Sequence, residues 1–512
     1  MRGWTSWCSM VVLAGCGGGA LGGGSADLTV CGDGEVVLPE LCDDGNDVTE
    51  VACEYGVAHC RACSAACDRE LELEGPVCGD GVKDAAEACD DGDGDACDGC
   101  LDDCTLHVNV CGDGARCGAE LCDDGNDVNG DGCSVGCDHQ FESIGRLVPA
   151  DRAAEQFFGV DVQIDGDVIV VGKIGTTTEP GSAYVFTRDP ADPGRWSETL
   201  RLRASDGGAE DGFGGSLALS GTLLAVGAHA QGGNRGAVYL YDRNRGGANR
   251  WGLVKKIVAS DAAAGDFFGT VDLAPNTLVV GAQDHGAGAV YVYKRNAGGT
   301  DNWGEAKILR AADGVTGDRF GVSVSLSGAL LAVGASSVNQ ARGAAYVFGR
   351  DTGGAGQWGQ LKKVTAADGA PFDNFGLPVS LSGDVLVVGA SLAPRAYVYA
   401  QNQGGTNAWG QLTALDPPAG EAGEFGGAVA AAGPLVLVGD PVAAKRTHAF
   451  SRNLGGANHF GANGYLARPG GDSVGTLFGY AVAVDHGVAV VADCGEDNRA
   501  GGVYLFEVPE TP

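Results

Sequence analysis

A Phe-Gly dipeptide marks seven similar copies between residues 141 and 508 of this chain, at intervals of 50 to 55 residues. Each copy usually continues with an apolar run ending in Val-Gly-Ala, an alternating segment such as 236–241, and a Trp before a short apolar segment. The repeated phenylalanines are Phe158, Phe213, Phe268, Phe320, Phe375, Phe425 and Phe478. Period-two alternation and short turns such as Ser220-Gly221 predict four short strands in each copy. The chain is therefore expected to fold here as a series of similar small sheets.

Four strands repeated at this period are what a β-propeller blade requires. The sequence thus predicts an all-β fold with a seven-bladed β-propeller over residues 141–508, preceded by small disulfide-rich, loop-dominated repeats. The seventh copy stops after its third strand, near 502–506. Phe141 lies ten residues before an Asp and seventeen before a Phe-Gly, which is the spacing that follows Trp303. We therefore expect residues 141–149 to complete the seventh blade, which closes the ring and covers an exposed sheet edge.

The pattern of residues 141–508 resembles FG-GAP repeats, the units of the integrin α-chain propeller. The resemblance implies that the repeated Phe, Gly and Trp residues are architectural, with the phenylalanines packed between blades. Calcium-binding loops of that family carry the pattern DxDxDG between the first two strands of a blade. Here most of these connections are two-residue turns, and the only acidic one, Asp165-Gly166-Asp167, is too short to enclose an ion. The sequence therefore does not favour calcium in the propeller.

Residues 28–140 form a cysteine-rich region of three repeats. Each repeat begins with Cys-Gly-Asp-Gly, carries Cys-Asp-Asp-Gly eleven residues later and closes with Cys-x3-Cys. Its sixteen cysteines are Cys31, Cys42, Cys53, Cys60, Cys63, Cys67, Cys78, Cys89, Cys97, Cys100, Cys104, Cys111, Cys117, Cys122, Cys133 and Cys137. Units of this size cannot bury an adequate apolar core, so we expect disulfides, with the pairing left open.

These repeats resemble the myxobacterial-type cysteine-rich disulfide repeat, and the third copy, Cys111 to Cys137, matches its pattern best. Two metal hypotheses accompany the disulfides. The pairs Cys60/Cys63 and Cys97/Cys100 have zinc-like spacing, which an exported chain disfavours. Acidic clusters offer the oxygen ligands that calcium takes, and the alternative is a set of solvated acidic turns. The calcium candidates are Asp90, Asp91, Asp93, Asp95, Asp123, Asp124, Asp127 and Asp131.

The N-terminus predicts export. Arg2 precedes a short apolar stretch that ends in Leu13-Ala14-Gly15-Cys16. This resembles a bacterial lipobox, which implies a signal peptide at 1–15, lipid attachment to Cys16 and a Gly-rich tether at 16–27. Gly rather than Asp at position 17 favours the outer membrane or cell surface. The alternative is an ordinary signal peptide that is cut elsewhere.

Charge and motifs limit the function. The formal net charge is -34, which makes nucleic acid a poor partner. The eight histidines show no metal-ligand spacing, and the sequence has no GxSxG elbow and no P-loop. His229, Asp284, His285 and Asp440 follow second strands and are expected to share one face, where they could form a hydrolase site. Cys494 lies at the same loop position of the seventh blade.

We therefore expect a cell-surface lipoprotein, not an enzyme, that binds or adheres through propeller loops. Its expected partners are a protein or glycan ligand and, through Cys16, the lipid bilayer. One alternative is a loop-built hydrolase on the propeller face. Another is a structural envelope spacer without a specific ligand. No cofactor is expected except possible calcium in the cysteine-rich repeats.

Overall fold

The computed structural model describes residues 139–418, 423–454, 456–471 and 475–508, and part of the cysteine-rich region. The described residues of that region are 31, 34–36, 38–46, 48–78, 80–83, 85, 87–90, 92, 100, 104, 122, 123, 125, 133 and 137. The chain divides into two compact units, Met1–Val110 and Cys111–Pro512. Within the described residues, no helix has the length and apolar character needed to cross a membrane.

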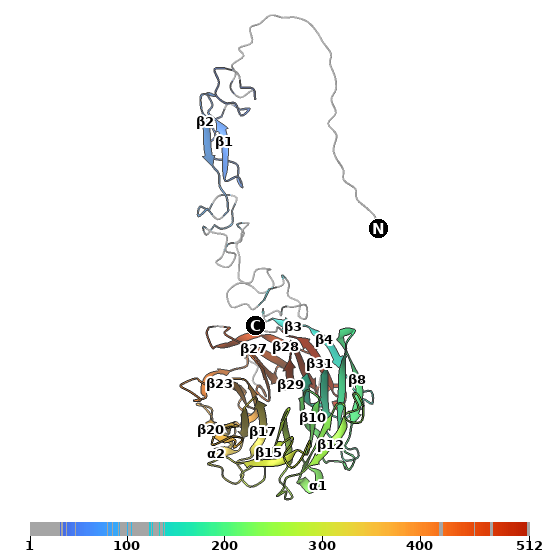
Figure 1. Ribbon diagram of the computed structural model, residues 1–512. Helices are drawn as coiled ribbons and strands as arrows, with labels where there is room; N and C mark the ends of the chain where they lie inside the picture. Colours follow the sequence, from blue (N-terminus) through green and yellow to red (C-terminus); the bar gives the residue numbers. More distant parts are fainter. Residues whose placement is uncertain are drawn as a thin grey trace, which may run out of the picture. The chain divides into compact units, whose positions relative to one another are not determined.

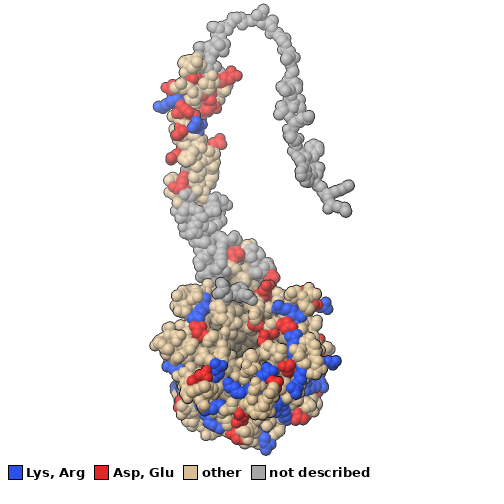
Figure 2. Space-filling view, viewed as in Figure 1, with Lys and Arg blue, Asp and Glu red and all other residues tan. Residues whose placement is uncertain are grey.

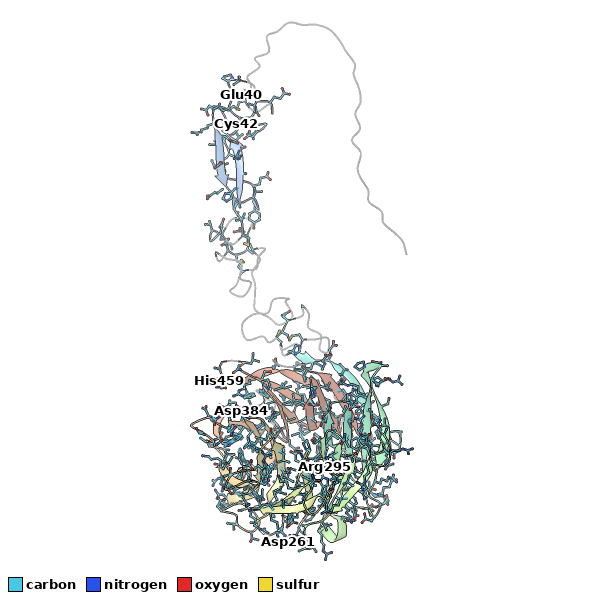
Figure 3. All side chains as sticks on the ribbon, viewed as in Figure 1. Glu40, Cys42, Asp261, Arg295, Asp384 and His459 are labelled. Atoms are coloured by element: carbon cyan, nitrogen blue, oxygen red, sulfur yellow. A yellow bond between two sulfur atoms is a disulfide. The ribbon has the colours of Figure 1, made fainter. Side chains whose placement is uncertain are left out.

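In the part of the first unit that the structure describes, disulfides accompany a small hairpin, β1 (His59–Cys63) with β2 (Glu70–Glu74). Glu40 and Cys42 lie near each other at one end of it (Figure 3). The bonds between described cysteines are Cys31–Cys67, Cys42–Cys63, Cys53–Cys60, Cys78–Cys104, Cys89–Cys100 and, in the second unit, Cys122–Cys133. In the first two repeats the opening cysteine therefore pairs with the last one, and the Cys-Asp-Asp-Gly cysteine pairs with the first of the Cys-x3-Cys pair. Cys97, Cys111 and Cys117 lie outside the described residues.

The second unit contains seven antiparallel sheets, which confirms the predicted seven-bladed propeller (Figure 1). Blade 1 has β5 (Phe158–Asp165), β6 (Val168–Lys173), β7 (Ser182–Asp189) and β8 (Asp192–Leu202). Blade 2 has β9 (Phe213–Ser220), β10 (Leu223–Ala228), β11 (Ala237–Asp242) and β12 (Gly252–Ile257). Blade 3 has β13 (Phe268–Ala274), β14 (Thr277–Ala282), β15 (Ala289–Lys294) and β16 (Gly304–Leu309). Blade 4 has β17 (Phe320–Ser327), β18 (Leu330–Ala335), β19 (Ala344–Gly349) and β20 (Gly359–Val364).

The remaining blades follow the same order. Blade 5 has β21 (Phe375–Ser382), β22 (Val385–Ala390), β23 (Arg395–Ala400) and β24 (Gly410–Leu415). Blade 6 has β25 (Ala428–Ala432), β26 (Leu435–Asp440), β27 (Arg446–Arg452) and β28 (Phe460–Ala467). Blade 7 has β29 (Phe478–Asp485), β30 (Val488–Asp493) and β31 (Gly502–Glu507). Three one-turn segments, α1 (Gln231–Asn234), α2 (Val338–Ala341) and α3 (Glu496–Arg499), join second to third strands.

The ring is closed by the segment that precedes blade 1. The strand β4 (Ser143–Leu147) pairs antiparallel with β31, with Arg146 opposite Tyr504, and so supplies the fourth strand of blade 7. The same segment also pairs with blade 6, which the sequence does not predict. The two-residue strand β3 (Gln140–Phe141) pairs in parallel with β28 of blade 6. We call residues 139–149 the closing ribbon, because they join the outer edges of blades 6 and 7.

The core lies between neighbouring blades. The seven repeated phenylalanines are at most 1% exposed, and Phe268 packs within a cluster that combines residues of blades 2 and 3. Each lies beside an aromatic ring of the third strand of its own blade, as Phe320 does beside Tyr346 at 5.5 Å between centroids. Trp303 and three related tryptophans are also buried. Because a single blade leaves both sheet faces apolar, burial requires a neighbour on each side.

Innermost strands are further joined by what we call the Ser/Asp ladder. Their inner edge lacks a partner strand, so its N–H groups need other acceptors. Side chains of the preceding blade supply them: Ser323 Oγ accepts from Val379 N at 3.0 Å, and Asp161 Oδ2 accepts from Leu217 N at 2.7 Å. Equivalent acceptors are Asp165, Ser216, Asp272, Ser325, Ser327, Ser380, Ser382 and Asp485. Asp165, considered above for calcium, thus bonds the next blade.

Candidate functional site

One face of the propeller carries two sets of loops, and we call it the loop face. These loops join second to third strands and fourth strands to the next blade. The five side chains considered for catalysis or reactivity follow or end second strands and so lie on this face, but in four different blades. They are His229 in blade 2, Asp284 and His285 in blade 3, Asp440 in blade 6 and Cys494 in blade 7. Charges of both signs are mixed over the propeller surface seen in Figure 2.

The histidine of blade 3 is held by carboxylates at both ring nitrogens. His285 Nδ1 lies 3.0 Å from Asp266 Oδ2, and its Nε2 lies 3.5 Å from Asp261 Oδ2. Asp284 instead pairs with Arg319 at 3.3 Å. A general base needs a ring nitrogen directed at a nucleophile or a water molecule. The contacts of His285 favour a structural role in fixing two neighbouring loops.

The thiol of Cys494 is a free cysteine and is 2% exposed. Burial raises its pKa to about 12. The thiolate, not the thiol, is the reactive form of cysteine. At neutral pH this side chain is therefore protonated and behaves as a small apolar group.

A repeated polar contact links each of the first five blades to the loop that enters it. The Asp that follows a Trp, or Phe141 in the case of blade 1, at a spacing of ten residues accepts a hydrogen bond from a third-strand tyrosine hydroxyl. The donor and acceptor pairs are Tyr184–Asp151, Tyr239–Asp206, Tyr291–Asp261, Tyr346–Asp313 and Tyr397–Asp368, at 2.5 to 3.0 Å. In the sequence these aspartates stand out only by their regular spacing from the preceding aromatic residue and the following Phe-Gly. Their nearly constant distance of about 30 residues from a tyrosine was the signal that could have revealed the contact.

A basic side chain completes several of these contacts. Lys256 lies 2.5 Å from Asp206, and Lys363 lies 2.6 Å from Asp313. The hydrogen bonds from Lys256 and then Tyr239 lower the pKa of Asp206 to about 2. Lys363 and Tyr346 likewise lower the pKa of Asp313, so the carboxylates of Asp206 and Asp313 are charged and hydrogen-bonded at neutral pH. This repeated Tyr–Asp–cation contact fixes the loops of the loop face to the blades.

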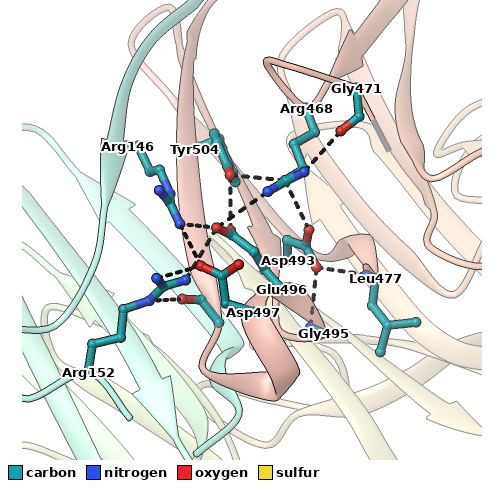
Figure 4. A network of polar contacts seen from close by, with 11 residues as sticks. Arg146, Arg152, Arg468, Gly471, Leu477, Asp493, Gly495, Glu496, Asp497 and Tyr504 are labelled. Carbon is teal, nitrogen blue, oxygen red and sulfur yellow. Dashed lines mark hydrogen bonds and ion pairs between the residues drawn. The ribbon is translucent and has the colours of Figure 1, made fainter. Parts of the chain in front are cut away.

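Blade 7 replaces the repeated contact with a buried ion network (Figure 4). Here the tyrosine Tyr504 donates to Glu496 Oε2 at 2.9 Å, and Glu496 comes from α3 rather than from the entering loop. Arg146, Arg152 and Arg468 surround the same carboxylate, with Arg152 at 3.2 Å and Arg468 at 3.6 Å. The side chains of Glu496 and of the neighbouring Asp493 are 0% exposed. The network thus joins the closing ribbon, the end of blade 6 and blade 7.

The last residue of the second strand also differs in type between blades: it is charged in three blades and alanine in the other four. Blades 2 to 5 have buried alanine there. Blades 6, 7 and 1 have Asp440, Asp493 and Lys173, each 0% exposed. Lys173 pairs with Glu179 at 3.4 Å, and Arg468 lies 3.7 Å from Asp493. Buried charge is costly unless it is paired, so blades 7 and 1 depend on specific ionic partners that blades 2 to 5 do not need. Asp440 of blade 6 accepts a hydrogen bond from Ala443 N at 3.2 Å.

The cysteine-rich region was the predicted metal site. Asp90 Oδ1 accepts hydrogen bonds from Gly81 N and Gly92 N, and Asp123 Oδ1 accepts from Gly125 N, so both aspartates fix tight turns. The remaining calcium candidates lie outside the described residues: Asp91, Asp93, Asp95, Asp124, Asp127 and Asp131. Disulfides occupy the sulfurs of Cys60, Cys63 and Cys100, so the zinc hypothesis is wrong for them. Calcium stays a prediction.

Two repeats nevertheless bring further carboxylates together. Ligand atoms of Glu87, Asp90 and Cys104 lie within 4.8 Å of one another, as do those of Glu40, Asp43 and Cys67. Both cysteines are in disulfides and supply no thiolate, which leaves two carboxylates in each group. The glutamates were not among the sequence candidates. Their equal position before Cys-Asp-Asp-Gly was the available signal.

Comparison with known proteins identifies the repeat. The family described as FG-GAP repeat matches residues 141–186, 196–241, 251–293, 303–348 and 358–405. No curated protein matches the chain. A chain in a crystal structure of the mitotic checkpoint complex is 12% identical with a TM-score of 0.47, over 73% of this chain and 94% of that one. Kluyvelomyces marxianus Hsv2 is 12% identical with a TM-score of 0.41, over 65% of this chain and 89% of that one.

Proposed function

Because this chain carries five tandem FG-GAP repeats within a seven-bladed β-propeller, we propose that it is an exported binding module and not an enzyme. Its many disulfides suggest an exported or extracellular protein. The FG-GAP propeller is consistent with a protein-binding function. In this proposal the loop face of the propeller carries the binding surface.

The observation that supports the proposal is that charged residues of the loop face form hydrogen bonds and ion pairs that hold the loops in place. Asp206 and Asp313 each bind a tyrosine and a lysine, and His285 is held between two carboxylates. Loops fixed in this way present a preformed surface, which lowers the entropy lost when a partner binds. Catalysis by the predicted set of His229, Asp284, His285 and Asp440 would require groups that come from three different blades.

We also propose that Cys16 carries the lipid that holds the module at a cell surface. The support is the Leu13-Ala14-Gly15-Cys16 sequence and the Gly-rich segment after it. Residues 1–30 lie outside the described residues. More than one acyl chain gives stable membrane binding, where a single chain gives only marginal binding. Cys16→Ser should move the protein from the membrane fraction to the soluble fraction of exported proteins.

The binding function is tested by photo-crosslinking on intact cells. A photoreactive amino acid replaces exposed residues of the loop face in the full chain, and matched sites on the opposite face, near the hairpin turns, serve as controls. We expect the same partner to be captured from several loop-face positions and not from the controls. Capture of no reproducible partner would favour the envelope spacer, and turnover of a substrate that copurifies with the chain would favour the hydrolase.

A further inference from the structure

One loop position repeats a left-handed backbone in almost every blade. It lies three residues before the Phe of Phe-Gly, in the loop that enters the blade. Its φ values are 59° at Glu155, 66° at Glu210, 91° at Gly265, 92° at Gly317, 73° at Phe372 and 87° at Gly475. The position before blade 6 lies outside the described residues. This backbone is unstrained for glycine and strained for larger side chains, which explains glycine in three blades.

Blade 5 places a phenylalanine at this unfavourable position. Phe372 is 70% exposed, so burial of its ring does not offset the backbone strain. Its N–H donates to Gln340 O at 3.1 Å, the same contact that Glu155 makes with Asn498 O at 3.0 Å. The loop geometry is therefore that of the other blades, and glycine would fit there. A strained, exposed aromatic ring that the fold does not need points to a function.

A second exposed apolar side chain lies against the same loop. Leu392 is 63% exposed, and its N–H donates to Asp373 O at 3.3 Å. The equivalent bond is made by Ala230, Asp284 and Ser337 in blades 2, 3 and 4. Small or polar residues therefore satisfy this position elsewhere. Blade 5 alone among these blades combines two large apolar residues at the loop tips.

A pocket of about 530 Å³ lies beside this pair. The connection between β22 and β23 has only four residues and lacks the one-turn segment found in blades 2, 4 and 7. The pocket is lined by Ala393 and Pro394 and by carboxylates of Asp368, Asp373 and Asp416. Among the described residues that line it, Arg395 is the only basic one, and it pairs with Asp368 and Asp416. The side chains of those two aspartates are 47% and 54% exposed, so a ligand can still reach their oxygens.

We infer that Phe372, Leu392 and the adjacent acidic pocket bind a protein segment that presents an apolar side chain next to lysine or arginine. The two exposed side chains supply the apolar anchor, which is where most binding energy concentrates in protein interfaces. The three carboxylates against one arginine leave the pocket negative, which favours a cationic side chain of the partner. This inference rests on the proposed binding function and names its surface and partner chemistry.

The test uses the purified full chain and three fluorescein-labelled peptides of equal length. One contains Leu and Lys, one Leu and Glu, and one Ser and Lys. Fluorescence anisotropy should show that the Leu/Lys peptide binds at least about 10-fold more tightly than either of the others. The reason is that the Ser/Lys peptide lacks the apolar anchor and the Leu/Glu peptide lacks the positive charge that matches the pocket. The variant Phe372→Gly with Leu392→Ser should lose about 10-fold or more of this affinity.

Matched controls separate binding from folding. Glu210→Gly with Ala230→Ser changes the same two loop positions in blade 2 and should leave the affinity unchanged. Because glycine relieves the strain at position 372, the blade 5 variant should melt no lower than the parent chain. Unchanged peptide binding by that variant, or equal binding of the Ser/Lys peptide, would overturn the inference. Binding of an oligosaccharide array that depends on Phe372, without peptide binding, would also overturn it in favour of a glycan.

The crosslinking experiment distinguishes failure of this site from failure of the proposed function. A reproducible partner that is captured equally by the parent chain and by the Phe372→Gly, Leu392→Ser variant would leave the binding function standing and place the surface elsewhere. The absence of any partner would contradict the proposed function itself.

Discussion

The interfaces between blades are of two kinds in this propeller. Between blades 4 and 5, three serine hydroxyls of the Ser/Asp ladder bond the backbone of the next blade. Between blades 6 and 7 the equivalent ladder positions are Ala428, Ala430 and Ala432, and the described residues there show no ladder bond. That interface instead has the buried network around Glu496 and the closing ribbon.

The difference reflects what each interface must hold. Blades 4 and 5 contain only consecutive segments of the chain, so short, local hydrogen bonds are enough to hold them together. Blades 6 and 7 must also capture the closing ribbon, which lies more than 300 residues earlier in the chain, at the cost of ordering a long loop. Ion pairs between Arg146 or Arg152 and Glu496, 350 and 344 residues apart, supply specificity for this pairing. We infer that blade 7 depends on few, strong contacts where the other blades depend on many weak ones.

The largest effect is expected for Glu496→Ala. Removing this carboxylate leaves three arginines and the Tyr504 hydroxyl without their shared partner, which should lower the free energy of unfolding by about 4 kcal/mol. The matched variant Asp313→Ala breaks the repeated contact of blade 4, which is half-exposed, and should cost about 1 kcal/mol. Urea unfolding followed by tryptophan fluorescence measures both. Equal losses would show that the two kinds of interface do not differ.

The closing ribbon should be nearly as sensitive. Leu147 is 4% exposed and packs in a cluster with residues of blades 1 and 7, so Leu147→Ala should cost about 3 kcal/mol. Ile144 lies on the same strand but is 37% exposed, and Ile144→Ala should cost under about 1 kcal/mol. The same urea titration compares the two variants. A small loss at Leu147 would mean that β4 contributes little to ring stability.

A ladder carboxylate provides a pH-dependent test. Burial raises the pKa of Asp161 to about 7, while the hydrogen bond from Leu217 N opposes this rise. Because the folded-state pKa lies above the unfolded value of 3.8, the folded protein binds the proton more tightly, and stability is lost as pH rises from about 4 to about 7. Asp161→Ser, which copies Ser216 of blade 2, should stabilise the protein by about 2 kcal/mol at pH 8 and hardly at pH 4. Melting curves across this range check it; a pH-independent difference would contradict the assigned pKa.

The smallest effect concerns one ladder bond. Ser323→Ala leaves the Val379 N–H without its acceptor and should cost about 1 kcal/mol. Conversely, Ala430→Ser would introduce an acceptor at the interface of blades 6 and 7, where the ladder is missing, and should recover up to about 1 kcal/mol. Differential scanning calorimetry resolves both shifts. If Ser323→Ala is neutral, water satisfies the inner edge and the ladder does not hold the blades.

Sequence reasoning recovered the repeat but not the exceptions to it. Seven Phe-Gly positions and the spacing at Phe141 predicted the blades and the strand that β4 forms, because period and alternation survive in every copy. The parallel pairing of β3 with β28 could not be predicted, since a strand of two residues shows no periodicity. The Glu496 network was equally hidden because its members are far apart in the chain. The proposed binding site at Phe372 could not be predicted from the sequence. It is recognised by the positive φ angle of Phe372 and by the glycines that occupy the same loop position in three other blades.

Hydrogen exchange of the folded full chain tests most directly whether the closing ribbon belongs to blade 7. If the ribbon belongs to blade 7, the amides of β4, residues 143–147, are protected to the same extent as those of β31, and both exchange in the same unfolding event. Exchange of β4 within seconds, while β31 and the other blades remain protected, would contradict closure of the ring by this ribbon.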